Sequence, residues 1–307
     1  MTESDKNPFL GLGIKSSFTS FSREKVASGI DCEGLPSGRY IDFSARKTFS
    51  VSGQETTPRG IYVSPDGSKM YTSGQSGDGV DEYTLSTPYD PTSATATHFF
   101  ATGSQDLSPT DLFFKPDGTK MFVLGDWRDE VYEYHLSTAW DLSTASYDSN
   151  YDLGTNTNIM SPRGLYFSPD GTKMLIFAAY MRYIVRYTLS TPWDVSTAGS
   201  KYANNFIATE ITGTGSEGGL WFNPEGTRMV IATTHNDKLY EYSFSSAYNI
   251  ANSTYIGGFS IGSINAFPVG LCWGSNGKYL YLIGSSPDTI DRFETCTDGA
   301  YKMLGRP

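Results

Sequence analysis

The sequence predicts an all-β protein of the β-propeller class, with five blades of four antiparallel strands, because one phrase recurs along its 307 residues. Its first half is the hairpin signal Ser-Pro-Asp-Gly, present in full or in variant form at residues 64–67, 115–118, 168–171, 223–226 and 275–277. The acidic residue of each copy, replaced by Asn276 in the last, recurs at intervals of 51, 53, 55 and 51 residues. Repeats of this length that hold several short strands are typical of propeller blades.

The third repeat shows how one copy of the phrase predicts one blade. Proline suits the second position of the hairpin turn, and Gly171 suits its left-handed fourth position. The strands are apolar on both faces, which indicates that neighbouring blades cover them. The elements expected here are strands at 164–167, 173–177, 184–189 and 205–208, with a rim turn at 190–194. The other repeats give fourth strands at 97–101, 147–153 and 255–261.

The two ends of the repeat array predict how the ring closes. The last set of strands, within residues 270–293, has no fourth strand after it, whereas residues 47–51 form an unassigned strand before the first set. We therefore expect the N-terminal strand to pair into the C-terminal blade, which removes the open edges. A ring of six blades is the alternative, if residues 38–45 contain a degenerate blade.

The count of strands divides the chain into an N-terminal arm at residues 1–46, the propeller at 47–295 and a C-terminal tail at 296–307. The arm is rich in Ser, Gly and Phe, a composition that suits a segment which orders against a partner protein. The alternative is that the arm folds beneath its own propeller. Three cysteines give no disulfide framework. Cys272 is expected to be a buried strand residue, and a bridge between Cys32 and Cys296 is left open.

Charge and hydropathy exclude several classes of partner. The net charge is −10 and no basic patch is visible, so neither nucleic acid nor an anionic membrane is an expected partner. No apolar run approaches the length of about 18 residues that a membrane span needs. The N-terminus lacks the basic start and apolar run of a secretion signal, so we expect synthesis in the cytoplasm without export.

The hairpin phrase in its strand–hairpin–strand setting resembles the repeats of TolB-like and YVTN-like β-propellers over residues 47–295. The second half of the phrase, Leu-Ser-Thr-Pro-Trp-Asp in full or variant form at residues 85–90, 136–141 and 189–194, resembles repeats of phage virion and tail-associated proteins. This second resemblance implies a virion location, with a cytoplasmic location as the alternative. It also implies other virion proteins as partners of residues 1–46.

The two faces of the predicted ring differ in sequence. The Ser-Pro-Asp-Gly hairpins and rim turns share one face and repeat nearly the same residues. The loops between second and third strands lie on the opposite face and vary, which is where binding sites usually lie on a rigid scaffold. Aromatic and polar side chains in these loops suit a glycan or a protein partner; they are Trp127, Arg128, Tyr180, Arg182, Tyr183 and His235. The alternative is that these rings pack only on neighbouring loops.

The start of each first strand lies nearest the central channel. Glycine recurs there, but Asp111 replaces it in the second blade. Arg59 and Arg163 precede the glycine in the first and third blades. These three side chains predict a cluster at the channel mouth that holds an anionic ligand, and a purely structural ion-pair network is the alternative.

The sequence contains no local catalytic signature. The three histidines lie in separate blades, no nucleophile elbow or phosphate-binding loop occurs, and each hairpin offers only one carboxylate, too few for calcium. We therefore expect no metal, no cofactor and no enzyme activity. The expected function is a non-enzymatic binding and assembly module, virion or tail-associated, that contacts a partner subunit or host glycan; homo-oligomerisation is left open. The alternative is a propeller enzyme or sugar-binding protein acting on a small substrate at the channel mouth.

Overall fold

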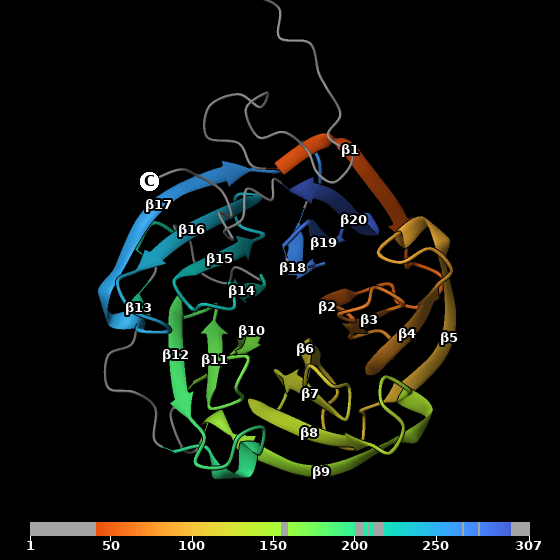
Figure 1. Cartoon of the computed structure of the whole chain (residues 1–307), viewed down its shortest axis with the longest axis horizontal. Helices are drawn as coiled ribbons and strands as arrows, with labels where there is room; N and C mark the ends of the chain where they lie inside the picture. The colour runs from red at the N-terminus through yellow and green to blue at the C-terminus, as the bar shows by residue number, and fades with distance from the viewer. Residues whose placement is uncertain are drawn as a thin grey trace, which may run out of the picture.

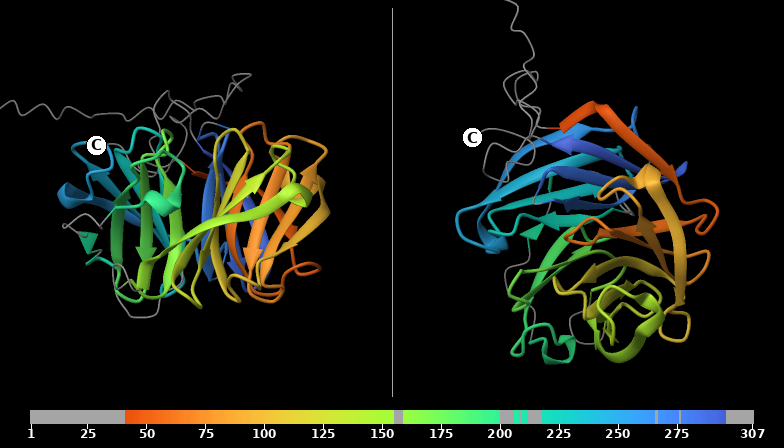
Figure 2. Two further views of the ribbon diagram at one scale, coloured as in Figure 1. Left: turned by 90° about the horizontal axis from the view of Figure 1, so that it is seen from below. Right: turned by 45° about the vertical axis from the view of Figure 1, so that its right-hand side comes forward.

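A computed structural model describes residues 41–154, 159–199, 206–207, 209–211, 218–265, 267–275 and 277–295. Their strands form five antiparallel sheets of four strands, arranged as blades around one axis (Figure 1). The prediction of a five-bladed β-propeller is confirmed. Strands run between two faces of the ring that carry only loops and turns (Figure 2). No helix among the described residues has the length and hydrophobicity needed to cross a membrane.

Each of the first four blades begins with its innermost strand and ends with its outermost one. Blade 1 contains β2 (Pro58–Val63), β3 (Lys69–Gly74), β4 (Gly79–Leu85) and β5 (Ala94–Ala101). Blade 2 contains β6 (Pro109–Phe114), β7 (Lys120–Gly125), β8 (Glu130–Leu136) and β9 (Ala145–Asp152). Blade 3 contains β10 (Pro162–Phe167), β11 (Lys173–Ala178), β12 (Tyr183–Thr188) and β13 (Phe206–Ile207). Blade 4 contains β14 (Leu220–Phe222), β15 (Arg228–Thr233), β16 (Lys238–Phe244) and β17 (Ser253–Ser260).

Blade 5 joins the two ends of the repeat array. It contains β18 (Pro268–Gly274), β19 (Tyr279–Ser285) and β20 (Asp288–Thr295), and β1 (Ile41–Ser50) pairs with β20 as its outermost strand. The predicted closure by an N-terminal strand is confirmed, although the strand begins at Ile41 rather than at residue 47. Figure 2 shows β1 lying along the outside of the last blade. The described residues of the predicted arm are thus part of the ring, and residues 1–40 lie outside the described residues, so the arm's docking role stays a prediction.

Charged contacts lock β1 in place. Arg46 donates from Nε and Nη2 to the two carboxylate oxygens of Asp291, at 2.7 and 3.0 Å. Thr48 and Asn265 also donate to this fully buried carboxylate, at 2.6 and 2.8 Å. On the other side, Lys47 pairs with Asp90 at the rim of blade 1. The closing strand therefore connects blade 5 with blade 1.

The hairpin and the rim turn of one blade pack on each other, which explains why both halves of the phrase recur together. Gly171 has a φ of +69°, and the indole of Trp193 lies where a Cβ of Gly171 would sit. The amide of Trp193 donates to the carbonyl of Gly171 at 3.0 Å. The same stacking recurs in the other early blades, with Tyr89 on Gly67, Trp140 on Gly118 and Tyr248 on Gly226.

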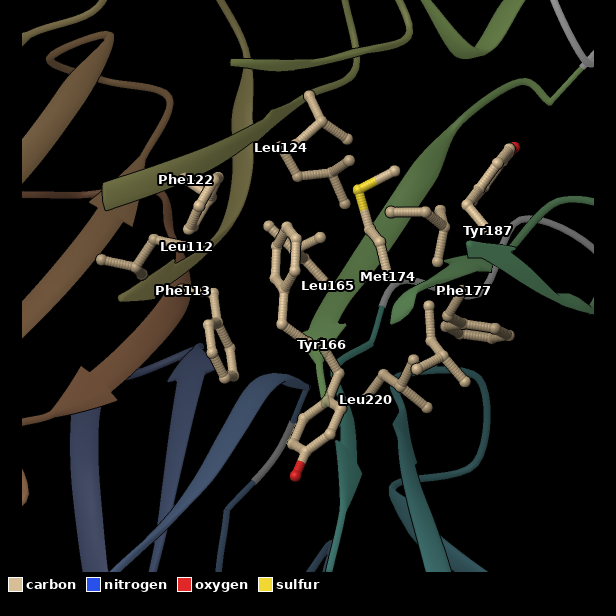
Figure 3. Close-up of a cluster of buried hydrophobic side chains, with 14 of the residues drawn as sticks. Leu112, Phe113, Phe122, Leu124, Leu165, Tyr166, Met174, Phe177, Tyr187 and Leu220 are labelled. Carbon is tan, nitrogen blue, oxygen red and sulfur yellow. The ribbon is translucent and has the colours of Figure 1, made fainter. Parts of the chain in front are cut away.

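The core lies between neighbouring blades, as the apolar strands predict. Figure 3 shows Phe113 and Phe122 of blade 2 beside Leu165 and Tyr166 of blade 3, and the ring centroids of Phe113 and Tyr166 lie 5.4 Å apart. Cys272 is buried in β18 as expected, whereas Cys32 and Cys296 lie outside the described residues, so their pairing is untested.

Aromatic side chains from successive blades form a circle around the axis, where the innermost strands approach the hairpin face. One side chain from each blade takes the same position: four are aromatic, namely Tyr62, Phe113, Tyr166 and Trp221, and the fifth is Cys272. Centroids of successive aromatic rings lie 5.3 Å apart from Tyr62 to Phe113, 5.4 Å from Phe113 to Tyr166 and 5.3 Å from Tyr166 to Trp221. We call the four aromatic residues the axial aromatic ring; their side chains pack on one another across the interfaces between blades 1 to 4.

Candidate functional site at the channel mouth

A β-bulge marks the start of the innermost strand in four blades. The register between first and second strands shifts there, and the residue at the shift is Arg59, Thr110, Arg163 or Val269. Bulges re-aim side chains and are common next to active sites. All four bulges lie at the loop end of the channel, opposite the Ser-Pro-Asp-Gly hairpins. The repeated bulge therefore places two arginines, from blades 1 and 3, at one mouth of the channel.

Arg59 is held by a polar network that spans two blades. Its Nη2 donates to Oε1 of Gln75 at 2.7 Å, and the amide nitrogen of Gln75 in turn contacts Ser108 at the entry to blade 2. Burial and the neighbouring charge of Arg163 together lower the pKa of Arg59 to about 10, against the opposing charges of Asp126 and Glu55. The two guanidinium groups are thus close enough to repel each other, and an anion between them would relieve that repulsion.

Arg163 is oriented by a separate partner in blade 2. Its Nη1 lies 2.8 Å from a carboxylate oxygen of Asp126 and also donates to the carbonyl of Pro162 at 3.3 Å. Asp126 is the first residue after β7, just as Gln75 is the first residue after β3. In both blade 1 and blade 2, the first residue of the loop between the second and third strands thus orients an arginine of the mouth.

Asp111 lies one residue further into the channel, at the position that glycine takes in the other blades. Its Oδ2 accepts from the amide of Leu165 in blade 3 at 2.8 Å, and its Oδ1 accepts from the amide of Leu112 at 2.9 Å. Gly60 leaves the room it needs, because a Cβ there would lie 2.7 Å from the Asp111 Cα. Burial raises the pKa of Asp111 to about 8, and the two amide donors only partly oppose this shift.

The Asp111 shift predicts how stability depends on pH. The folded protein keeps a proton on Asp111 up to about pH 8, while the unfolded chain loses it near pH 4, so folding is favoured less as pH rises between these values. We expect the free energy of unfolding of wild type, minus that of Asp111→Asn, to fall from pH 4 to pH 8 and to level off above. Urea unfolding across this range measures the difference, and a difference that stays constant with pH would contradict the assignment. Burial also raises the pKa of Asp81 to about 6. Because Asp81 titrates in both proteins, its effect on stability cancels in the difference.

Trp127 and Arg128 follow Asp126 in the loop of blade 2. Their amides donate to the buried carboxylate of Asp106 at 3.4 and 3.0 Å, and the hydroxyl of Tyr132 donates to it at 3.4 Å. The Arg128 guanidinium carbon lies 4.9 Å from the centroid of the indole. Even so, Trp127 is 57% exposed. A loop held by buried hydrogen bonds therefore presents a large aromatic side chain to solvent beside the mouth.

The other predicted loop residues lie in blades 3 and 4. Tyr180 is 59% exposed, at the loop position that Trp127 takes in blade 2. Arg182 has a φ of +57° and donates from Nη1 to the carbonyl of Ile211 at 3.0 Å, so the fold uses it as a turn residue. Tyr183 begins β12 and is partly buried, and His235 is exposed in the loop of blade 4. The structure thus brings Arg59, Asp111 and Arg163 to one mouth, with Trp127 and Arg128 beside it.

Sequence reasoning missed Gln75, Ser108 and Asp126, the groups that orient the two arginines. Their positions carry a weak signal, because each is a polar residue next to the mouth-side end of a strand. Among the described residues, no cluster of three or more His, Cys, Asp or Glu side chains could hold a metal ion. The described groups at the mouth thus include two cations, their partners Gln75 and Asp126, and two buried acidic side chains, Asp111 and Glu55; the charge of Glu55 acts on Arg59.

No protein-family model and no curated protein sequence matches this chain. Several solved structures resemble this chain in their fold. The luciferin-regenerating enzyme has a TM-score of 0.50 at 13% identity, covering 85% of this chain and 98% of that one. A periplasmic gluconolactonase of Pseudomonas aeruginosa has a TM-score of 0.47 at 12% identity, covering 81% and 68%. A protein from Lactobacillus plantarum has a TM-score of 0.46 at 15% identity, and the matched region spans 74% of this chain and only 64% of that one.

The comparison corrects two predictions. The neighbours found for this propeller include enzymes such as the luciferin-regenerating enzyme and include no virion or tail-associated protein among those reported, so the predictions of a non-enzymatic function and of a virion or tail-associated module are wrong. The physical reason for the error is that a propeller assembles its site from separate blades, so a missing local motif does not argue against catalysis. At this identity the likeness shows the fold alone, and the named activities are those of the neighbours.

Proposed function

We propose that this chain is an enzyme that acts on a small anionic substrate at the channel mouth. In this proposal Arg59 and Arg163 bind the anionic group, and Asp111 exchanges a proton with the reacting part of the substrate. The observation that carries the proposal is the pair of arginines on repeated bulges, one blade to each side of a buried carboxyl group. The finer assignment to TolB-like or YVTN-like repeats stays a prediction from the repeated phrase.

The electrostatics of the arginine pair favour an anionic ligand. The oxygens of Asp111 accept backbone amides rather than an arginine. Asp126 pairs with Arg163, and the charges of Asp126 and Glu55 also act on Arg59. The repulsion by Arg163 is nevertheless the largest effect of any neighbouring charge on Arg59. A phosphate or carboxylate group of a ligand would oppose that repulsion through charge-assisted hydrogen bonds.

The raised pKa of Asp111 supports proton transfer. A carboxyl group with a pKa of about 8 is mostly protonated at neutral pH and can donate a proton to a developing alkoxide. Hydrolysis of a lactone or another small ester is a reaction of this kind: water adds to the carbonyl carbon, the ring C–O bond breaks and the leaving oxygen takes a proton. The fold neighbours include a gluconolactonase, so sugar lactones are the first substrates to assay.

The binding part of the proposal is tested by calorimetric titration with inorganic phosphate and with 6-phosphogluconate. Arg59→Gln and Arg163→Gln should each weaken binding about tenfold or more, the usual loss for a hydrogen bond to a charged group. Lys115→Gln is the matched control, because it removes one positive charge from a hairpin on the opposite face. Equal affinities for the two arginine variants and the control would overturn the proposal.

The catalytic part is tested by following acid release from phosphorylated and unphosphorylated sugar lactones in a pH-stat. Asp111→Asn should lower kcat about 100-fold or more, while phosphate affinity changes little. A wild-type rate equal to the uncatalysed rate for every lactone would overturn the assignment of lactone hydrolysis.

A further inference from the structure

We infer that Trp127 is a second contact surface of the same site, so that the substrate carries a ring with an apolar face next to its anionic group. The inference rests on the proposed function and deepens it by naming the substrate class: a small anion attached to a sugar or aromatic ring. Trp127 acts in this inference as a specificity-determining residue, because its ring offers packing area and no reacting group.

The position of Trp127 follows from its neighbour in the chain. Asp126 holds the guanidinium of Arg163 at 2.8 Å, so the loop of blade 2 is fixed to the anion-binding group itself. Trp127 is the next residue, and blade 2 lies between the blades that carry Arg59 and Arg163. In this inference, a ligand whose anionic group meets the arginines extends its remaining atoms toward the loop that carries the indole.

The loop of blade 2 is held rigidly enough to present the indole without rearrangement. Asp106 is fully buried, and it accepts hydrogen bonds from the amides of Trp127 and Arg128 and from the hydroxyl of Tyr132. Arg128 covers the indole at 4.9 Å. More than half of the Trp127 surface is nevertheless open to solvent. Preorganised aromatic surface of this kind binds rings at little entropic cost.

The next blade provides a matched comparison. Tyr180 is as exposed as Trp127 and occupies the equivalent loop position, but the residue before it is Ala179, which has no group to hold an arginine. If exposure alone made a contact surface, both aromatic residues would matter equally. The link to Arg163 through Asp126 singles out Trp127.

The test compares phenyl phosphate with inorganic phosphate in calorimetric titrations. Wild type should bind phenyl phosphate about tenfold more tightly than phosphate. Trp127→Ala should abolish this preference and leave phosphate affinity unchanged, Trp127→Phe should keep most of it, and Tyr180→Ala should keep all of it.

The outcomes separate this inference from the proposed function. If Trp127→Ala retains the preference, or if Tyr180→Ala loses it to the same degree, the inference is overturned while the arginine site stands. If wild type binds neither probe, the proposed anion site fails and the inference falls with it. Loss of affinity for both probes in Arg163→Gln, together with loss of the phenyl preference alone in Trp127→Ala, is the pattern we expect.

Discussion

Deletion of residues 1–51 is expected to lower the free energy of unfolding by about 5 kcal/mol or more and the Tm by roughly 10 °C. The deletion removes β1, exposes the backbone edge of β20 and takes the Arg46 guanidinium away from a carboxylate with no exposed surface. It also removes the fully buried Val51. Thermal and urea unfolding followed by circular dichroism measure the loss.

Deletion of residues 1–40 is the control for this truncation. It leaves β1, Arg46 and Val51 in place, so the difference between the two shortened proteins measures the closing strand itself. Arg46→Gln should lower the free energy of unfolding by less than the deletion of residues 1–51 does. The buried Asp291 then loses its cation but keeps its hydrogen bonds from Thr48 and Asn265. Equal melting temperatures for the two shortened proteins would contradict the role we assign to β1.

Gly171→Val is expected to lower the free energy of unfolding by about 3 kcal/mol or more. Two effects add up. Valine is strained at a φ of +69°, and its Cβ would lie 2.3 Å from the indole nitrogen of Trp193, so the rim turn must move. Urea unfolding gives the difference in stability, and the near-ultraviolet signal of the tryptophans reports the displacement of Trp193.

Gly257→Val is the matched control for the hairpin variant. Gly257 lies in the outer strand β17, has an ordinary φ and would place its Cβ where no atom lies within 4 Å. It should change stability by less than about 0.5 kcal/mol. If both valine variants unfold at the same urea concentration, neither the turn conformation nor the stacking of Trp193 limits stability.

The architecture was predictable because its determinants are local and repeated. A turn that needs a left-handed residue selects glycine, and the stacking of a rim residue on that glycine selects an aromatic side chain, so the pairs Gly118–Trp140 and Gly171–Trp193 are visible as one phrase. The closing strand was predictable by counting strands. Its start at Ile41 was not, because the pairing of Arg46 with Asp291 joins residues 245 positions apart.

The candidate site was predictable only in part. Arg59, Asp111 and Arg163 stand out because they break a regular pattern at one position of the repeat. Their partners follow no such pattern: Gln75 holds an arginine of its own blade, whereas Asp126 holds an arginine of the next blade. The acidity of Asp111 depends on burial and on an amide of Leu165 from another blade, which only the assembled ring provides.

The axial aromatic ring couples the packing of four blades. Phe113 contacts Tyr62 of blade 1 and Tyr166 of blade 3, and Tyr166 in turn contacts Trp221 of blade 4. Tyr62, Phe113 and Tyr166 are at most 8% exposed. A substitution at Phe113 or Tyr166 therefore disturbs two interfaces between blades at once, whereas a substitution on an outer strand disturbs only its own blade.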